Sequence, residues 1–154
     1  MYLVSLLVAF LTIAPLVAQT TTLARADEAA VVAFAQAAAM RALNFAQDDI
    51  AGLSRARPDF TAEGWKAFMK HKRGFLTPEG TPTFSSSFVP SGNAVVTGKE
   101  NGIVHLRIPG TLKHSQHGSS TTYRANIEVQ AGGEPMKIHQ LEETICGLPS
   151  LFCP

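Results

Sequence analysis

The sequence predicts an α+β domain in which N-terminal helices pack on a curved antiparallel sheet of about four strands. Residues 27–51 are rich in alanine and begin with acidic residues, a composition that favours a helix. Residues 61–73 repeat apolar side chains at helical spacing. From residue 77 onward, proline and glycine separate segments in which apolar and polar residues alternate, as in half-buried strands. Helices that precede strands in this way predict a helical layer over the apolar face of one sheet.

The first helix is predicted over residues 27–51, with a weaker continuation to residue 57. Apolar residues recur along it at positions suited to burial against a sheet. Asp48 and Asp49 interrupt the pattern, so we expect either a kink or a pair of helices there. Adjacent helix positions point apart, so these two carboxylates are not expected to share a proton as an acid–base pair.

The second helix is predicted to begin at Thr61, whose hydroxyl can accept a hydrogen bond from an unpaired backbone N–H of the first turn. Phe60 and Trp65 then occupy the two positions of a hydrophobic staple, and Gly64 stands where Glu or Gln would complete a capping box. The default interpretation is a core helix, and a ligand site is the alternative. The core motif comprises Phe60, Thr61, Gly64, Trp65 and Phe68.

Cationic side chains crowd the polar side and the end of this second helix. Cations near a helix C-terminus interact favourably with the helix dipole. A solvated face is the default interpretation, and a docking patch for an acidic partner is the alternative. The residues concerned are Lys66, Lys70, His71, Lys72 and Arg73.

Strand segments separated by turn signals make up the rest of the domain. Asn101 and Gly102 predict a two-residue type I′ hairpin turn, because both residue types tolerate positive φ. Pro109 and Gly110 are expected to force a bulge or bend in the middle of a strand. The predicted strands cover residues 84–89 (weak), 94–99, 103–114, 121–130 and 136–145, with a polar turn over residues 114–120.

Alternation also predicts which side chains face away from the helices. Val104 and Leu106 fall on the apolar face, whereas His105 and Arg107 fall on the other. The next strand adds polar residues to that second face, among them Arg124 and Glu128. We expect this outer face to be solvated or to form a partner surface.

The N-terminal segment suits export. Residues 2–18 carry no charge and are mostly aliphatic, and an A-x-A sequence ends at Ala26. We predict a signal peptide over residues 1–26, cleaved after Ala26, and an exported domain over residues 27–145. The apolar run is also marginally long enough for a membrane span, so an uncleaved anchor is the alternative. No Lys or Arg precedes the run, so the signal is atypical or the chain starts upstream.

The exported part is electrically neutral. All 12 acidic residues lie after residue 26, and of the 13 basic residues only Arg25 does not, which leaves 12 of each. A general nucleic-acid binder needs a net basic face, so nucleic acid is not an expected partner. Residues 146–154 are predicted to form a small loop closed by a disulfide between Cys146 and Cys153, since an even cysteine pair in an exported protein is usually bonded.

Signals of covalent or metal chemistry are weak. His114 and His117 provide two imidazoles in a polar turn, but no third ligand is evident, so a surface turn is favoured over a metal site. No nucleophile with a triad pattern and no phosphate-binding or dinucleotide fingerprint occurs. No cofactor is expected.

The segment Phe60-Thr61-Ala62-Glu63-Gly64-Trp65-Lys66-Ala67-Phe68 resembles an F-T-x-x-G-W-x-x-F segment of the DotI/IcmL/TraM family of type IV secretion and conjugation proteins. Weaker likenesses follow in the strands at residues 104–109 and 121–130. The resemblance covers roughly residues 33–145. Members carry a cytoplasmic segment and a transmembrane helix before this domain, and the terminal cysteine loop has no counterpart that we can match to the family.

The resemblance implies a periplasmic domain with the nuclear-transport-factor-like cone fold. It also implies a non-enzymatic part of an envelope-spanning secretion apparatus, acting through contacts with other envelope proteins or with further copies of itself. Membrane contact is expected only if the N-terminal segment is uncleaved. Because cone folds also host enzymes, a ligand-binding protein or a small-molecule lyase or isomerase is the alternative. Its polar cavity residues would be His105, Arg107, Glu128 and His139.

Overall fold

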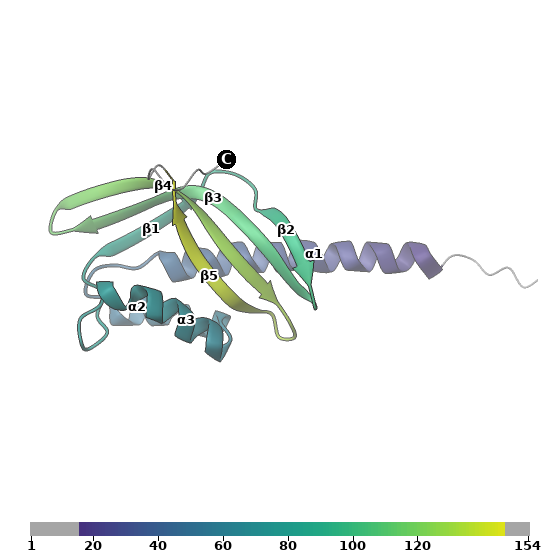
Figure 1. The fold of residues 1–154 in the computed structure, drawn as a ribbon, viewed down its shortest axis with the longest axis horizontal. Coiled ribbons are helices and arrows are strands. Elements are labelled where there is room, and N and C mark those ends of the chain that lie inside the picture. The colour runs from purple at the N-terminus through teal and green to yellow at the C-terminus, as the bar shows by residue number, and fades with distance from the viewer. Residues whose placement is uncertain (1–15, 147–154) are drawn as a thin grey trace, which may run out of the picture.

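Three helices pack on a five-stranded antiparallel sheet (Figure 1). The computed structural model describes the backbone of residues 16–146 and the side chains of residues 28–146. The helices are α1 (Leu16–Leu43), α2 (Ile50–Ser54) and α3 (Ala62–Lys72), with 3₁₀ turns η1 (Arg57–Asp59) and η2 (Arg73–Phe75). The strands are β1 (Ser85–Pro90), β2 (Val95–Glu100), β3 (Ile103–Gln116), β4 (Ser119–Gly132) and β5 (Lys137–Ile145). The α+β class and the order of helices before strands are as predicted, and the five strands correspond to the five predicted strand segments, including the weak one at residues 84–89.

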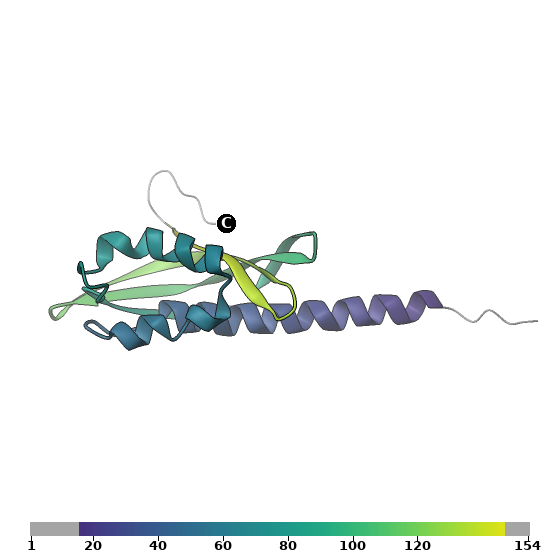
Figure 2. The ribbon, with the colours of Figure 1, turned by 90° about the horizontal axis from the view of Figure 1, so that it is seen from below.

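Helix α1 is the longest element and extends beyond the sheet. Its C-terminal half packs against β1, β3 and β4, whereas its N-terminal half projects away from the other elements (Figures 1 and 2). The predicted cleavage point after Ala26 therefore falls within a helix. Residues 1–15 of the predicted signal peptide lie outside the described part of the chain, so cleavage stays a prediction. Between residues 16 and 146, no helix combines the length and the apolar character needed to cross a membrane.

The first predicted helix is divided in two. Helix α1 ends at Leu43, and Phe45 exchanges backbone hydrogen bonds with Ser86 of β1, at 3.0 and 2.8 Å. A new helix then starts at Asp49, whose carboxylate accepts a hydrogen bond of 2.7 Å from the Gly52 N–H. A helix pair was one of the two expectations for this region. A single helix to residue 51 was wrong, because the chain leaves α1 to pair with a strand.

Strand β3 is the central strand of the sheet and pairs with two different strands along one of its sides. Its first half pairs with β2 and its second half with β1, while its other side pairs with β4 along its whole length. Pro109 lies where β2 gives way to β1, and its carbonyl accepts a hydrogen bond of 3.0 Å from Ser91. Its missing N–H therefore removes no ladder bond. No bulge forms there, because Pro109 pairs with Asn126 in an unbroken register, so a bend is the part of the expectation that this pairing leaves open.

Two tight turns connect the long strands. Asn101 and Gly102 have φ values of 51° and 78°, which confirms the predicted type I′ geometry between β2 and β3. His117 and Gly118 repeat this geometry, with φ values of 48° and 84°, between β3 and β4. The polar turn predicted over residues 114–120 is thus only two residues long, because the flanking polar residues continue the β3–β4 ladder.

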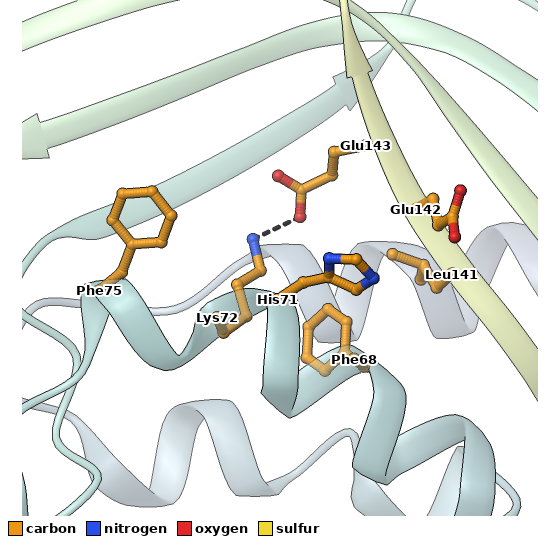
Figure 3. Close-up of a pocket in the computed structure, with 7 residues that line it drawn as sticks. All are labelled: Phe68, His71, Lys72, Phe75, Leu141, Glu142 and Glu143. Carbon is orange, nitrogen blue, oxygen red and sulfur yellow. Dashed lines mark hydrogen bonds and ion pairs between the residues drawn. The ribbon is translucent and has the colours of Figure 1, made fainter.

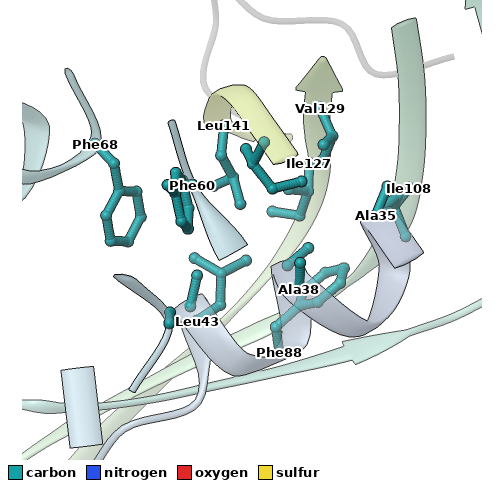
Figure 4. Close-up of a cluster of buried hydrophobic side chains, with 14 of the residues drawn as sticks. Ala35, Ala38, Leu43, Phe60, Phe68, Phe88, Ile108, Ile127, Val129 and Leu141 are labelled. Atoms are coloured by element: carbon teal, nitrogen blue, oxygen red, sulfur yellow. The ribbon is translucent and has the colours of Figure 1, made fainter. Parts of the chain in front are cut away.

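One cluster of buried apolar side chains fills the space between the helices and the sheet (Figure 4). Four alanines of α1 are completely buried, and their small side chains let the helix lie close to the strands; they are Ala35, Ala38, Ala39 and Ala42. Alternate residues of β3 point into this cluster, as the sequence predicts, and leave the other residues on the outer face. Large buried side chains include Leu43, Phe68, Phe88, Leu106, Ile108, Leu112, Ile127 and Ile138.

Candidate functional site

Helix α3 is the element that joins the helical layer to the edge of the sheet. Thr61 caps it, because the Thr61 hydroxyl accepts a hydrogen bond of 3.0 Å from the Gly64 N–H. The Thr61 N–H in turn donates to the carbonyl of Ile138 in β5, at 2.9 Å. The predicted staple is also present, since the rings of Phe60 and Trp65 meet edge-to-face with centroids 5.5 Å apart. These contacts fix both the start of α3 and its position on β5.

Gly64 has a role that capping arguments do not reveal. A Cβ atom at this position would lie 2.6 Å from the carbonyl oxygen of Ile138 and 2.8 Å from that of His139. Glycine is therefore required because the helix backbone approaches the strand backbone too closely for a side chain. Trp65, on the next position, is half-buried and packs against the core cluster rather than within it.

The far end of α3 carries a buried ion pair. Lys72 is only 5% exposed, and its Nζ pairs with the carboxylate of Glu143 on β5 (Figure 3). The same ammonium lies 5.6 Å from the centre of the Phe68 ring. Lys72 therefore does not belong to the solvated face expected for the helix end. The sequence feature that could have predicted this burial is the spacing of four residues between Phe68 and Lys72, which places Lys72 on the apolar stripe of the helix.

A pocket of about 250 Å³ opens beside this ion pair, between α3, η2 and β5 (Figure 3). Its lining mixes two aromatic rings with a paired cation and anion. Lys72 and Glu143 neutralise each other, whereas Glu142, which also lines the pocket, forms no ion pair with the described residues. The lining residues are Phe68, His71, Lys72, Phe75, Leu141, Glu142 and Glu143.

His114 is half-buried on strand β3 and does not lie in a surface turn. Its ring is 4.6 Å from that of Phe84 and 5.8 Å from that of Tyr123, between centroids. Burial lowers the pKa of His114, and the Lys72 cation lowers it further while the Glu143 carboxylate opposes both. Its Nε2 atom is buried without a hydrogen-bond partner among the described residues. Burial thus favours the neutral imidazole.

The two histidines of the His114-x-x-His117 pair do not act together. His117 is exposed in the β3–β4 turn, whereas His114 is half-buried on β3. Over the described part of the chain, no group of three or more metal-ligating side chains converges. The pair thus offers no preformed metal centre.

Of the four residues considered for a catalytic cavity, His105, Arg107 and Glu128 lie on the outer side of the sheet. Arg107 and Glu128 form an ion pair of 2.6 Å, with side chains 40% and 37% exposed. Only His105 and Glu128 line a common hollow, of about 140 Å³. His139 is the extra residue of a bulge in β5. No acid–base constellation is therefore assembled from these residues in an enclosed cavity.

Cations of α3 and of the following turn η2 line a second groove. Lys66, Lys70 and Arg73 are all exposed and follow one another at helical spacing. They line a groove of about 700 Å³ between α3 and the loop at residues 76–80, together with Trp65, Met69, Leu76, Thr77, Pro78 and Gly80. We refer to this feature as the α3 groove. It combines an apolar floor with three positive charges on its rim.

Solved structures match this arrangement of elements. The chain superimposes on an IcmL-like type IV secretion system protein from Legionella pneumophila with a TM-score of 0.66, at 14% identity, covering 81% of this chain and 97% of that one. The periplasmic domain of DotI gives a TM-score of 0.65 at 17% identity, covering 77% and 96% of the two chains. The fold is that of the IcmL-like and DotI periplasmic domains. A periplasmic fragment of TraM also matches, with a TM-score of 0.55 at 15% identity, covering 79% and 98%.

The likeness is one of structure. No protein-family model matches the sequence, and no curated protein matches it either. The shared IcmL/DotI fold therefore rests on the helices and the sheet as whole elements. Nearly the full length of each related domain has a counterpart in this chain.

Proposed function

We propose that the protein is an exported component, or a relative of a component, of a type IV secretion or conjugation apparatus, and that it acts through protein–protein contacts in the periplasm. The observation that carries the proposal is the match of almost the entire IcmL-like and DotI domains to this chain. A fold can host several functions, so the surface of this particular chain has to supply the rest of the argument.

Two features of the surface favour contacts over catalysis. The space under the sheet is filled by apolar side chains, and the polar candidates for a cavity lie on the outer face or in a bulge. The α3 groove, by contrast, exposes apolar and cationic groups side by side. Such a mixed surface suits recognition of another protein.

The proposal includes the processing of both ends. We infer that residues 1–26 act as a signal peptide removed after Ala26, which leaves the domain at residues 27–145 in the periplasm. An uncleaved segment would instead hold the domain at the inner membrane, facing the periplasm. In the oxidising periplasm, Cys146 and Cys153 are proposed to close the loop at residues 146–154. Cys153 lies outside the described residues.

Fractionation of the host envelope tests the proposal. The tagged full chain is followed through spheroplasting, N-terminal sequencing and purification from solubilised envelopes. We expect a periplasmic form that starts at Asp27 and that co-purifies with components of the apparatus. A matched strain that lacks the genes of the apparatus is the control. A cytoplasmic product, or the same set of bound proteins in both strains, would overturn the proposal.

A further inference from the structure

We propose that the α3 groove binds an acidic segment of a partner protein, with an apolar side chain of that segment seated between the cations. The inference rests on the proposed function, since it names the chemistry of one partner. It goes beyond the shared fold, because it depends on side chains of this chain alone. Three observations carry it: the shape of the groove, the state of its charges and the character of its floor.

The charges on the rim have no counter-ions within the described part of the chain. Five other cations each pair with a carboxylate, namely Arg41, Arg55, Lys72, Lys99 and Arg107. Lys66, Lys70 and Arg73 form no such pair between residues 28 and 146. Like charges four residues apart on a helix repel each other and destabilise it. A complementary anion from outside would relieve this repulsion.

The facing loop does not neutralise the rim. Its single carboxylate belongs to Glu79, which is not among the residues that line the groove. A hydrogen bond from its own backbone and one from the Thr77 side chain lower the pKa of Glu79, so it is held as an anion at its own turn. The groove therefore keeps its positive character.

The floor selects a protein segment over a membrane surface. Trp65 packs against Phe60 and Phe68, with ring centroids 5.5 and 5.6 Å away, so it stays in the hollow and does not project outward. Polybasic membrane-binding segments usually contain about four to eight cations, and this rim has three. A recessed apolar floor accommodates one side chain of a peptide better than the plane of a bilayer.

The length of the groove rim indicates the conformation of the bound segment. The rim runs from Lys66 to Arg73, which spans about 10 Å at the helical rise of about 1.5 Å per residue. An extended chain covers that distance in about three to four residues, and every second side chain lies on the same face. An apolar residue that faces Met69 and Leu76 therefore shares its face with carboxylates two positions before and two positions after it, and these carboxylates can reach the cations of the rim.

A defined peptide tests the inference on the full chain. The probe is a blocked synthetic peptide, Gly-Glu-Glu-Phe-Glu-Glu-Gly, and its control carries Gln in place of each Glu. Trp65 is the only tryptophan, so its fluorescence reports binding at the groove directly. We expect saturable binding of the acidic peptide that weakens with salt, and no binding of the Gln peptide.

Charge reversal localises the effect. Lys66→Glu together with Lys70→Glu is expected to weaken binding by about tenfold or more, since attraction becomes repulsion. The matched control is Lys113→Glu together with Arg124→Glu, which makes the same charge change at exposed positions on β3 and β4. The control is expected to bind like the unmodified chain. Circular dichroism spectra confirm that both variants are folded.

Several outcomes would overturn the inference. They are no binding of the acidic peptide, equal binding of the Gln peptide, or equal loss in the two double variants. Binding to vesicles containing anionic phosphatidylserine without binding to the peptide would assign the groove to a membrane surface. A self-associated chain that dissociates on Lys66→Glu and Lys70→Glu, and does not bind the peptide, would assign it to a second copy. Any of these results leaves the envelope-fractionation test of the wider function standing.

Discussion

The close approach of α3 to β5 makes Gly64→Ala a sharp test of the structure. The added carbon would lie 2.6 Å from the Ile138 carbonyl oxygen, whereas ordinary contacts begin at 3.4 Å, so the helix would have to move by 0.8 Å. Overpacking of this kind costs about 1–3 kcal/mol. The movement also stretches the hydrogen bond from Thr61 to Ile138, worth about 1 kcal/mol. Alanine has a higher helix propensity than glycine, which offsets about 1 kcal/mol of this destabilisation. We therefore expect a net loss of about 1–3 kcal/mol.

Urea denaturation followed by the fluorescence of Trp65 measures this change. Gly74→Ala is the matched control, because a Cβ atom there would meet nothing within 4 Å. It should leave the free energy of unfolding unchanged or raise it by up to about 1 kcal/mol. If Gly64→Ala stabilises the protein as an ordinary helical glycine replacement does, α3 does not contact β5 as described.

Three further predictions concern the neighbouring side chains. Lys72→Met leaves the Glu143 carboxylate unpaired and should lower the free energy of unfolding by about 2–3 kcal/mol, which is less than the loss for a fully buried ion pair. Adding Glu143→Leu removes the unpaired carboxylate and should recover most of this loss. If the double variant shows no recovery, Lys72 and Glu143 are not paired. Trp65→Ala should cost about 2–3 kcal/mol by thermal unfolding, because the ring is half-buried, and an unchanged midpoint would place it in solvent. The lowered pKa of His114 means that the unfolded chain binds the proton more readily, so stability should fall as the pH drops through the ordinary histidine range near about 6.5. His114→Phe should flatten that dependence, whereas His117→Asn should not.

Local signals in the sequence predicted the elements whose structure depends on neighbours along the chain. The cap at Thr61, the staple of Phe60 with Trp65 and the turn at Asn101 each depend on a few consecutive residues. The alternation in β3 predicted the buried face because a strand period of two leaves no other arrangement. These features need no knowledge of the tertiary fold.

The features that sequence reasoning missed depend on contacts between distant segments. Helix α1 stops at Leu43 because Phe45 pairs with β1, and this partner lies about forty residues ahead. The strand ladder continues to Gln116 because β4 supplies partners for polar residues that alone would favour a turn. Pro109 is accommodated without a bulge because two strands share one side of β3.

The candidate site was predictable only in part. Lys66 and Lys70 are on the exposed side of α3, as their helical spacing indicates, and Arg73 is exposed in the turn η2 that follows. The ion pair of Lys72 with Glu143 was missed, although both residues occupy positions of an otherwise apolar stripe. A charged residue at such a position signals a buried pair only when its partner is known, and the partner lies on another element.

Transfer by the host is the measurement that tests the central claim most directly. The gene is deleted in frame, and the transfer of a conjugative plasmid or of a reporter substrate of the apparatus is counted with and without the gene restored in trans. A component that works through envelope contacts predicts a drop in transfer of at least about tenfold, which the restored gene reverses. Unchanged transfer in the deleted strain, with the apparatus otherwise intact, would contradict the account.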